Sequence, residues 1–130
     1  MNFNEFKIYL GELEAEIMEI VWEHGKTTVR EMLEFISKKK KKLAYTTVMT
    51  VMTRLCEKKM LLRKIDSAGI YIYTPMESKH VFFARFSGNL ITSMLKNFGD
   101  VTVASFIDIL NGNEFKKSEE WRKKLRKIIK

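Results

Sequence analysis

Apolar and polar residues alternate with a helical period near the start of the chain. Four apolar residues share one face of a helix that ends near His24, and glutamates cover the opposite face. The apolar positions are Leu13, Ile17, Ile20 and Val21. Because the glutamates are evenly spaced along one segment, we interpret them as a solvated helix face. A metal site would normally draw its carboxylates from several segments.

A second helix is expected to begin after Thr28, which can cap it. Glu31 follows three residues later and completes the sequence pattern of a capping box. This helix is expected to end in a run of five lysines, residues 38–42. Cations are favourable at a helix C-terminus, so the lysines suit that position on local grounds as well.

A third helix is predicted from Tyr45, and its polar side is unusual. The apolar side carries Val48, Val51, Met52 and Leu55. The polar side carries Thr46, Thr47, Thr50, Thr53 and Arg54, with Met49 at the border. Threonine is only a modest helix former, and a helix face made for solubility would carry glutamate and lysine instead. This face is therefore expected to have a function.

A β-hairpin is predicted next along the chain. Residues 61–65 and 70–74 are rich in β-branched and aromatic residues, and the sequence Asp-Ser-Ala-Gly between them is typical of a turn. Pro75 is expected to end the second strand. Three helices followed by a hairpin predict a winged helix-turn-helix over residues 1–75, with the third helix as the recognition helix and the hairpin as the wing.

The pattern becomes helical again after Pro75. We predict helices over residues 77–97 and 103–110, separated by a break at Gly99 and Asp100, and a last helix from Ser118. Helices of this length cannot shield so many apolar side chains alone, which indicates an oligomer interface in residues 76–130. The candidate dimerisation residues are Phe82, Phe83, Phe86, Leu90, Met94, Phe106, Leu110, Trp121 and Leu125. The predicted fold class is mainly α with a small β-hairpin, a winged helix-turn-helix plus a C-terminal helical dimerisation region.

The charge balance favours a polyanionic partner. The net charge is +8 and the sequence pI is about 9.6, so nucleic acid is the first candidate and an anionic membrane surface the second. No apolar run approaches the roughly 20 residues of a membrane helix. The first residues lack the apolar core of a signal peptide, and the single cysteine, Cys56, fits a reducing compartment. We therefore expect a cytoplasmic protein.

The predicted recognition helix explains the threonines. A threonine hydroxyl can donate to or accept from a base edge, and its methyl group can contact the methyl group of thymine. We expect Thr46, Thr47 and Thr50 to contact bases, and Arg54 to reach a phosphate or a guanine. The other candidate DNA contacts are the phosphate-binding Lys41 and Lys42, the wing residues Arg63 and Lys64, and Thr28 at a helix N-terminus. A lysine run alone is more often a solvated helix end, but its place before a threonine-lined helix favours a DNA contact.

No catalytic arrangement is recognisable in the sequence. Its two histidines, His24 and His80, are far apart, and neither a Cys/His nor a Ser/His/Asp constellation can be assigned. The sequence contains neither a glycine-rich phosphate loop nor metal-ligand spacing. We therefore expect no enzyme, cofactor or metal site. The alternative function is a winged-helix protein–protein adaptor without specific DNA binding, since a fold does not define a function.

Several segments together resemble one family, the penicillinase and methicillin-resistance repressors and their copper-responsive relatives. The resemblance lies in Leu10-x-x-x-Glu14, in Met18 and Trp22, in TVRE from Thr28, in YTTVMTVMTRL from Tyr45, and in YIYTP at the end of the wing. It spans residues 8–98 well and the remainder loosely. It implies a homodimeric transcriptional repressor whose winged domains bind a palindromic operator and whose C-terminal helices form the dimer.

The resemblance also raises the question of the inducing signal. Copper-responsive members resemble one another in paired Cys-x-Cys motifs, which Cys56 alone cannot form. The β-lactam-responsive members are inactivated by cleavage between Asn and Phe, which implies a membrane-embedded sensor protease as a partner. The counterpart by position is Ser105-Phe106, which lacks the Asn, whereas Asn97-Phe98 has the dipeptide at another position.

Overall fold

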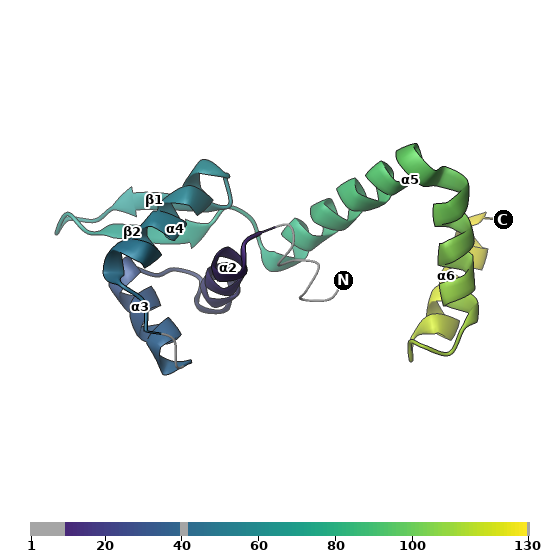
Figure 1. Cartoon of the computed structure of the whole chain (residues 1–130), viewed down its shortest axis with the longest axis horizontal. Coiled ribbons are helices and arrows are strands. Elements are labelled where there is room, and N and C mark those ends of the chain that lie inside the picture. Colours follow the sequence, from purple (N-terminus) through teal and green to yellow (C-terminus); the bar gives the residue numbers. More distant parts are fainter. Residues whose placement is uncertain (1–9, 40–41, 130) are drawn as a thin grey trace. The chain divides into compact units, whose positions relative to one another are not determined.

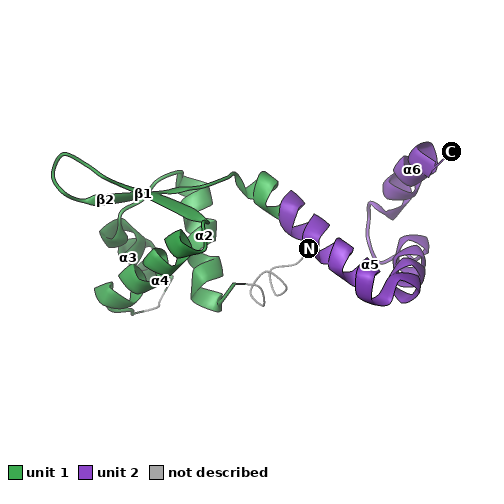
Figure 2. Ribbon diagram, turned by 90° about the horizontal axis from the view of Figure 1, so that it is seen from above, with its two compact units in different colours: residues 1–83 green, residues 84–130 purple. Residues whose placement is uncertain are grey.

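The computed structural model describes residues 10–39 and 42–129 of the chain. Its elements are α2 (Glu12–His24), α3 (Val29–Lys38), α4 (Tyr45–Glu57), β1 (Leu61–Ile65), β2 (Tyr71–Pro75), α5 (Lys79–Asn111) and α6 (Ser118–Ile129), as Figure 1 shows. The chain forms two compact units, residues 1–83 and residues 84–130 (Figure 2). The predicted fold class is confirmed, because the described chain is mainly helical and has one antiparallel hairpin.

The predicted start of the second helix is confirmed by its cap, and the first helix begins with a cap as well. Gly11 is the N-cap of α2, and its backbone N–H donates to Glu14 Oε1 at 3.3 Å. Thr28 caps α3: its hydroxyl accepts from the Glu31 backbone N–H at 3.1 Å, and its own N–H donates to Glu31 Oε1 at 3.0 Å. Both caps satisfy N–H groups that have no partner inside the helix.

The core of the first unit lies between α2, α3, α4 and the hairpin. The apolar faces of the three helices point into it, and the fully buried side chains include Ile17, Met18, Val21, Met32, Ile36, Val48, Met52 and Leu55. Glu14 connects the start of α2 to the end of α4, because Lys58 Nζ lies 2.8 Å from its Oε2. The helix order and this packing give the helix-turn-helix its shape.

The hairpin is extended by a short third segment. Its register pairs Arg63 with Tyr73 and Ile65 with Tyr71. Thr27 also pairs with Tyr73, through backbone hydrogen bonds of 3.0 and 2.8 Å, so the turn before α3 is attached to the edge of β2. Asp66 Oδ1 accepts two backbone N–H bonds in the turn, and Gly69 has a φ of 81°, which glycine adopts without steric cost. β2 begins one residue later than predicted.

The start of α5 belongs to the first unit. Trp22 packs against Phe82 and Phe83, with ring centroids 5.3 and 5.8 Å apart. The compact units therefore meet in sequence between Phe83 and Ala84, whereas the hydrophobic pattern alone suggests a division after Pro75. The assignment of DNA binding to residues 1–75 and of dimerisation to residues 76–130 stays a prediction.

The second unit contains the rest of α5 and α6. Phe98 has non-helical backbone angles (φ −143°, ψ 48°) and divides α5 into two helical parts. The break thus comes one residue before the predicted Gly99. Within this unit the Arg122 guanidinium donates to the backbone oxygen of Leu110, and the rings of Phe115 and Trp121 lie 5.8 Å apart. Among the described residues, no helix is long and apolar enough to cross a membrane.

Candidate nucleic-acid interface

The threonine-lined side of α4 is exposed in the first unit. Thr46, Thr47, Thr50 and Arg54 are exposed, and Thr53 is half-buried. The opposite side of the helix is anchored by the buried Val48, Val51, Met52 and Leu55. Because the apolar side is held in the core, the hydroxyl groups stay accessible to a ligand that approaches from solvent.

Two larger side chains lie beside the threonines. Tyr45 and Met49 are both exposed and are separated by one helical turn of α4. Met49 was predicted at the border of the polar side and Tyr45 had no predicted role, although their spacing of four residues places them on the same side of a helix. They extend the accessible side of α4 by an aromatic and an apolar group.

The lysine run contributes one described candidate before α4. Lys42 is exposed three residues before the helix begins, whereas Lys41 lies outside the described residues. Lys38, at the end of α3, has its Nζ 5.9 Å from the centre of the Phe35 ring. Lys42 therefore lies in sequence between the two helices of the helix-turn-helix, where a cation can contact a phosphate.

The two cations of the wing lie on opposite faces of the hairpin. Arg63 and Lys64 are both exposed, but they are neighbours on one strand, so their side chains alternate. The Arg63 guanidinium lies 4.5 Å from the centre of the Tyr71 ring. A hydrogen bond to the Tyr73 side chain raises the pKa of Arg63, which keeps it charged at any physiological pH.

The two tyrosines of β2 have different environments, although they share a face. Tyr73 is 1% exposed and belongs to the core, whereas Tyr71 is 43% exposed. Their alternation along the strand does not by itself decide whether these rings pack on the protein or contact DNA. The structure assigns Tyr73 to packing and leaves Tyr71 partly exposed.

A hollow of about 320 Å³ separates α4 from the wing. It is lined by Thr28, Val29, Arg30, Tyr45, Met49, Gly69, Ile70, Tyr71 and Tyr73. Its walls are mostly aromatic and apolar, and Arg30, which is exposed, supplies a positive charge. Arg30 was not among the predicted site residues, although its position two residues after the Thr28 cap was the available signal.

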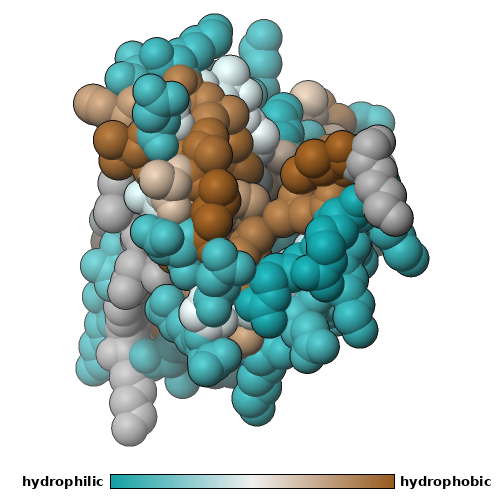
Figure 3. All heavy atoms as spheres, turned by 90° about the vertical axis from the view of Figure 1, so that its right-hand side faces the viewer, coloured by the Kyte–Doolittle hydropathy of each residue, from teal (hydrophilic) through white to brown (hydrophobic). Residues whose placement is uncertain are grey.

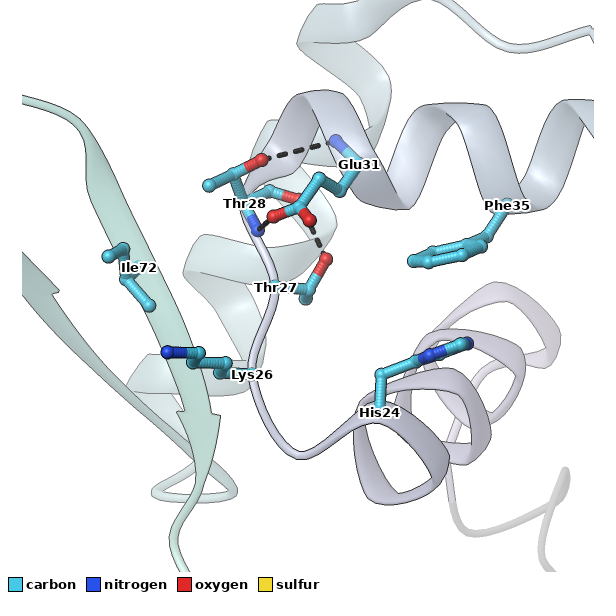
Figure 4. A pocket seen from close by; sticks show the side chains of 7 residues that line it. All are labelled: His24, Lys26, Thr27, Thr28, Glu31, Phe35 and Ile72. Atoms are coloured by element: carbon cyan, nitrogen blue, oxygen red, sulfur yellow. Dashed lines mark hydrogen bonds between the residues drawn. The ribbon is translucent and has the colours of Figure 1, made fainter.

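A second hollow, of about 270 Å³, lies on the other side of the turn before α3. Figure 4 shows its lining residues. The rings of His24 and Phe35 are stacked, with their centroids 4.1 Å apart, and the capping box joins Thr28 and Glu31. The Thr28 hydroxyl oxygen and N–H are both engaged in this box. A phosphate at the start of α3 would therefore meet the N–H groups of the following residues, which helices leave without internal partners.

The predicted dimerisation residues divide into exposed and buried sets. Leu90, Met94, Phe106 and Trp121 are exposed, and Phe83 and Leu125 are half-buried. Phe82, Phe86 and Leu110 are buried, and Phe82 is only 1% exposed where Trp22 covers it. Phe82 is therefore a core residue of the first unit, which the hydrophobic period alone could not distinguish from an interface residue.

The second unit exposes further apolar side chains that the prediction had not selected. They include Ile91, Leu95, Phe98, Val101, Ile107 and Ile109. Figure 3 shows hydrophobic side chains in contiguous groups on the face that it draws. Exposed apolar surface of this extent is typical of a protein–protein interface.

The two candidate cleavage positions differ in backbone conformation. Ser105 and Phe106 are exposed but lie within the helical part of α5 that follows the break. Asn97 and Phe98 lie at the break itself, and Phe98 is 67% exposed. A protease binds extended backbone, so the position at the break needs less local unfolding.

The remaining reactive groups form no recognisable centre in the described part of the chain. There, no group of three or more His, Cys, Asp or Glu side chains is placed to hold a metal ion. Burial raises the pKa of the Cys56 thiol, an effect that the nearby charge of Arg63 partly offsets. Cys56 is thus protonated at neutral pH and poorly nucleophilic.

Comparisons with known proteins identify relatives of this chain. "Transcriptional regulator BlaI" of Mycobacterium tuberculosis is 38% identical over 71 residues, which are 54% of this chain and 50% of that protein. The match thus spans about half the length of that relative. "Penicillinase repressor" of Bacillus licheniformis is 29% identical over 97 residues, covering 68% of this chain and 74% of that protein.

A solved structure and a family model complete the comparison. The adhesin competence repressor of Streptococcus pyogenes has a TM-score of 0.41 and 16% identity, covering 82% of this chain and 89% of that one. The family model described as penicillinase repressor matches residues 10–130. Because that match includes both compact units, the chain belongs to the penicillinase repressor family.

Proposed function

We propose that this chain is a DNA-binding transcriptional repressor that places α4 in the major groove. The observation that supports this best is the exposed threonine side of α4, held outward by a buried apolar side in a winged helix-turn-helix. Membership of the penicillinase repressor family and the names of its relatives agree with this function. In this arrangement, short hydroxyl side chains let a helix approach the base edges closely.

The proposed DNA contacts are of two kinds: base contacts, which read the sequence, and phosphate contacts, which position the protein. Thr46, Thr47 and Thr50 contact bases, and Arg54 contacts a base or a phosphate further along the groove. Lys41, Lys42, Arg63 and Lys64 are the candidate phosphate contacts, and the start of α3 after Thr28 is a further one. Phosphate contacts position the protein and supply most of the affinity, whereas the base contacts select the sequence.

A homodimer that binds a palindromic operator is part of the proposal. The exposed apolar side chains of the second unit, among them Leu90, Met94 and Phe106, support an interface there. A two-fold dimer presents two copies of α4 to two half-sites, so the spacing of the half-sites adds to recognition. Phe82 and Leu110 contribute to this interface only indirectly, through the packing of their own units.

We further propose that repression ends when a signal acts on the second unit. Proteolysis by a membrane-embedded sensor protease is the route that the family resemblance implies, with Ser105-Phe106 as the counterpart by position. The Asn97–Phe98 bond has the more favourable backbone conformation for cleavage, since it lies at the break of α5 and Phe98 is exposed. A cut at either position would separate α6 from the first part of α5.

A fluorescence anisotropy titration tests the function. The full chain is titrated with duplexes from the region upstream of its own gene and with scrambled duplexes at the same salt concentration. A repressor should bind one upstream duplex at least about 1,000-fold more tightly than the scrambled duplex. Equal and weak binding to all duplexes would contradict the proposal and would support the adaptor alternative.

A further inference from the structure

The hairpin register determines which wing cation lies on the side of α4. Arg63 pairs with Tyr73 and Ile65 pairs with Tyr71, so these four residues share one face. Lys64 pairs with Ile72 on the other face. The first face borders α4, because Tyr71 and Tyr73 line the hollow that Tyr45 and Met49 also line. The second face borders α2 and α3, because Ile72 lines the hollow that contains His24 and Phe35.

Arg63 is held in place on the face beside α4. Its guanidinium lies 4.5 Å from the centre of the Tyr71 ring, a distance typical of a cation–π contact. Its cross-strand partner is Tyr73, whose buried side chain raises the pKa of Arg63. Since a guanidinium has five N–H donors, most of them stay available to a phosphate oxygen. Lys64 has no such ring contact among the described interactions.

We propose that Arg63, positioned by the ring of Tyr71, is the wing's contact with the phosphate backbone beside α4, and that Lys64 makes no such contact. The inference rests on the proposed function, which treats Arg63 and Lys64 alike, and it assigns the phosphate contact to Arg63 alone. A pre-positioned guanidinium loses less side-chain freedom when it binds than a free one does. Tyr71 is therefore a positioning residue that acts through Arg63 without contacting DNA.

The test uses a labelled mixed-sequence duplex of about three helical turns and a series of salt concentrations. Phosphate contacts are independent of base sequence, so the operator need not be known. In anisotropy titrations of the full chain, Arg63→Ala should lower the log–log salt slope by about 0.9 and weaken binding about tenfold at low salt. Lys64→Ala, the matched control, removes the same charge from the other face and should weaken binding less than about twofold.

A double-mutant cycle tests the role of Tyr71. Tyr71→Leu should weaken binding about threefold in the parent chain but should have no effect in an Arg63→Ala background. Tyr71→Phe keeps the ring and should bind like the parent chain. Tyr71→Val is a second ring-deleted variant that suits a strand, and thermal unfolding is followed for every variant.

Three outcomes would contradict the inference in distinguishable ways. Equal slope changes for Arg63→Ala and Lys64→Ala would show that both faces of the wing meet phosphates. An undiminished effect of Tyr71→Leu in the Arg63→Ala background would show that Tyr71 contacts DNA itself. If the parent chain showed no salt-dependent DNA binding at all, the proposed function would fail and the inference with it.

Discussion

The indole Nε1 of Trp22 donates a hydrogen bond of 3.1 Å to the backbone oxygen of Glu77, residues that are 55 positions apart in the sequence. This bond attaches the last turn of α2 to the segment that leads from the wing into α5. The rings of Phe82 and Phe83 pack against the same indole. Trp22 thus anchors the start of α5 within the first unit.

Replacing Trp22 should separate the contribution of the hydrogen bond from that of packing. Trp22→Phe removes the donor but keeps a ring, and should lower the free energy of unfolding by about 1 kcal/mol. Trp22→Ala also removes the packing on two phenylalanines and should cost about 3 kcal/mol, since the indole is half-buried. Urea unfolding followed by far-UV circular dichroism measures both. Equal losses for the two variants would show that the ring packing contributes nothing.

The division between reading and positioning predicts different effects for two substitutions in or beside α4. Thr50→Ala should reduce the preference for the operator over other sequences by about 1–3 kcal/mol and leave non-specific binding nearly unchanged. Lys42→Ala should weaken binding to all sequences alike and reduce the salt slope. Gel-shift titrations with operator and scrambled duplexes provide the comparison. The same profile for both variants would refute the division.

The exposed apolar residues of the second unit should determine the oligomeric state. Met94→Glu places a charge in the proposed interface and should weaken dimerisation by at least about 100-fold. Sedimentation velocity over a range of protein concentrations measures the change. Ile65→Glu is the matched control, because Ile65 is also exposed but lies on the wing. A parent chain that stays monomeric at high concentration, or equal effects of both variants, would rule out an interface at Met94.

Cys56 should be a slow nucleophile. Burial raises the pKa of its thiol above the usual 9.0, so the rate of alkylation by iodoacetamide should be lower in the folded chain than in urea. Because the folded-state pKa is the higher one, the corresponding stabilisation is complete below pH 9 and is lost as the pH rises through the folded-state pKa. Arg63→Ala removes a charge that lowers this pKa, and should shift the alkylation profile to still higher pH. A profile in the folded chain that matches the one in urea would contradict the burial effect.

A protease should cleave α5 first at its break. Chymotrypsin should cut after Phe98 at least about tenfold faster than after Phe106, because only the second cut requires a continuous helix to open. Mass spectrometry of early digestion products identifies the sites. Phe98→Ala should abolish the first cut and leave the second unchanged. Faster cleavage after Phe106 in the parent chain would favour the position that the family resemblance indicates.

The sequence by itself determined the local structure of the chain. The apolar period of Val48, Val51, Met52 and Leu55 required one side of α4 to be buried. The other side, with Thr46, Thr47 and Thr50, was therefore exposed. The Thr28 and Glu31 pair located the start of α3, and Gly69 located the turn of the hairpin. These features depend on residues close in sequence, whose relative positions follow from the local backbone geometry and from short-range side-chain hydrogen bonds.

Only the tertiary structure decided which surface each side chain met. Tyr71 and Tyr73 share a face and a residue type, yet only Tyr73 reaches the core, where Thr27 pairs with it from a distant segment. Phe82 fitted the same helical pattern as Leu90, but the indole of Trp22 buries Phe82 in the first unit. Periodicity shows that a face is apolar and does not reveal what covers it, because that depends on contacts between residues far apart in the sequence.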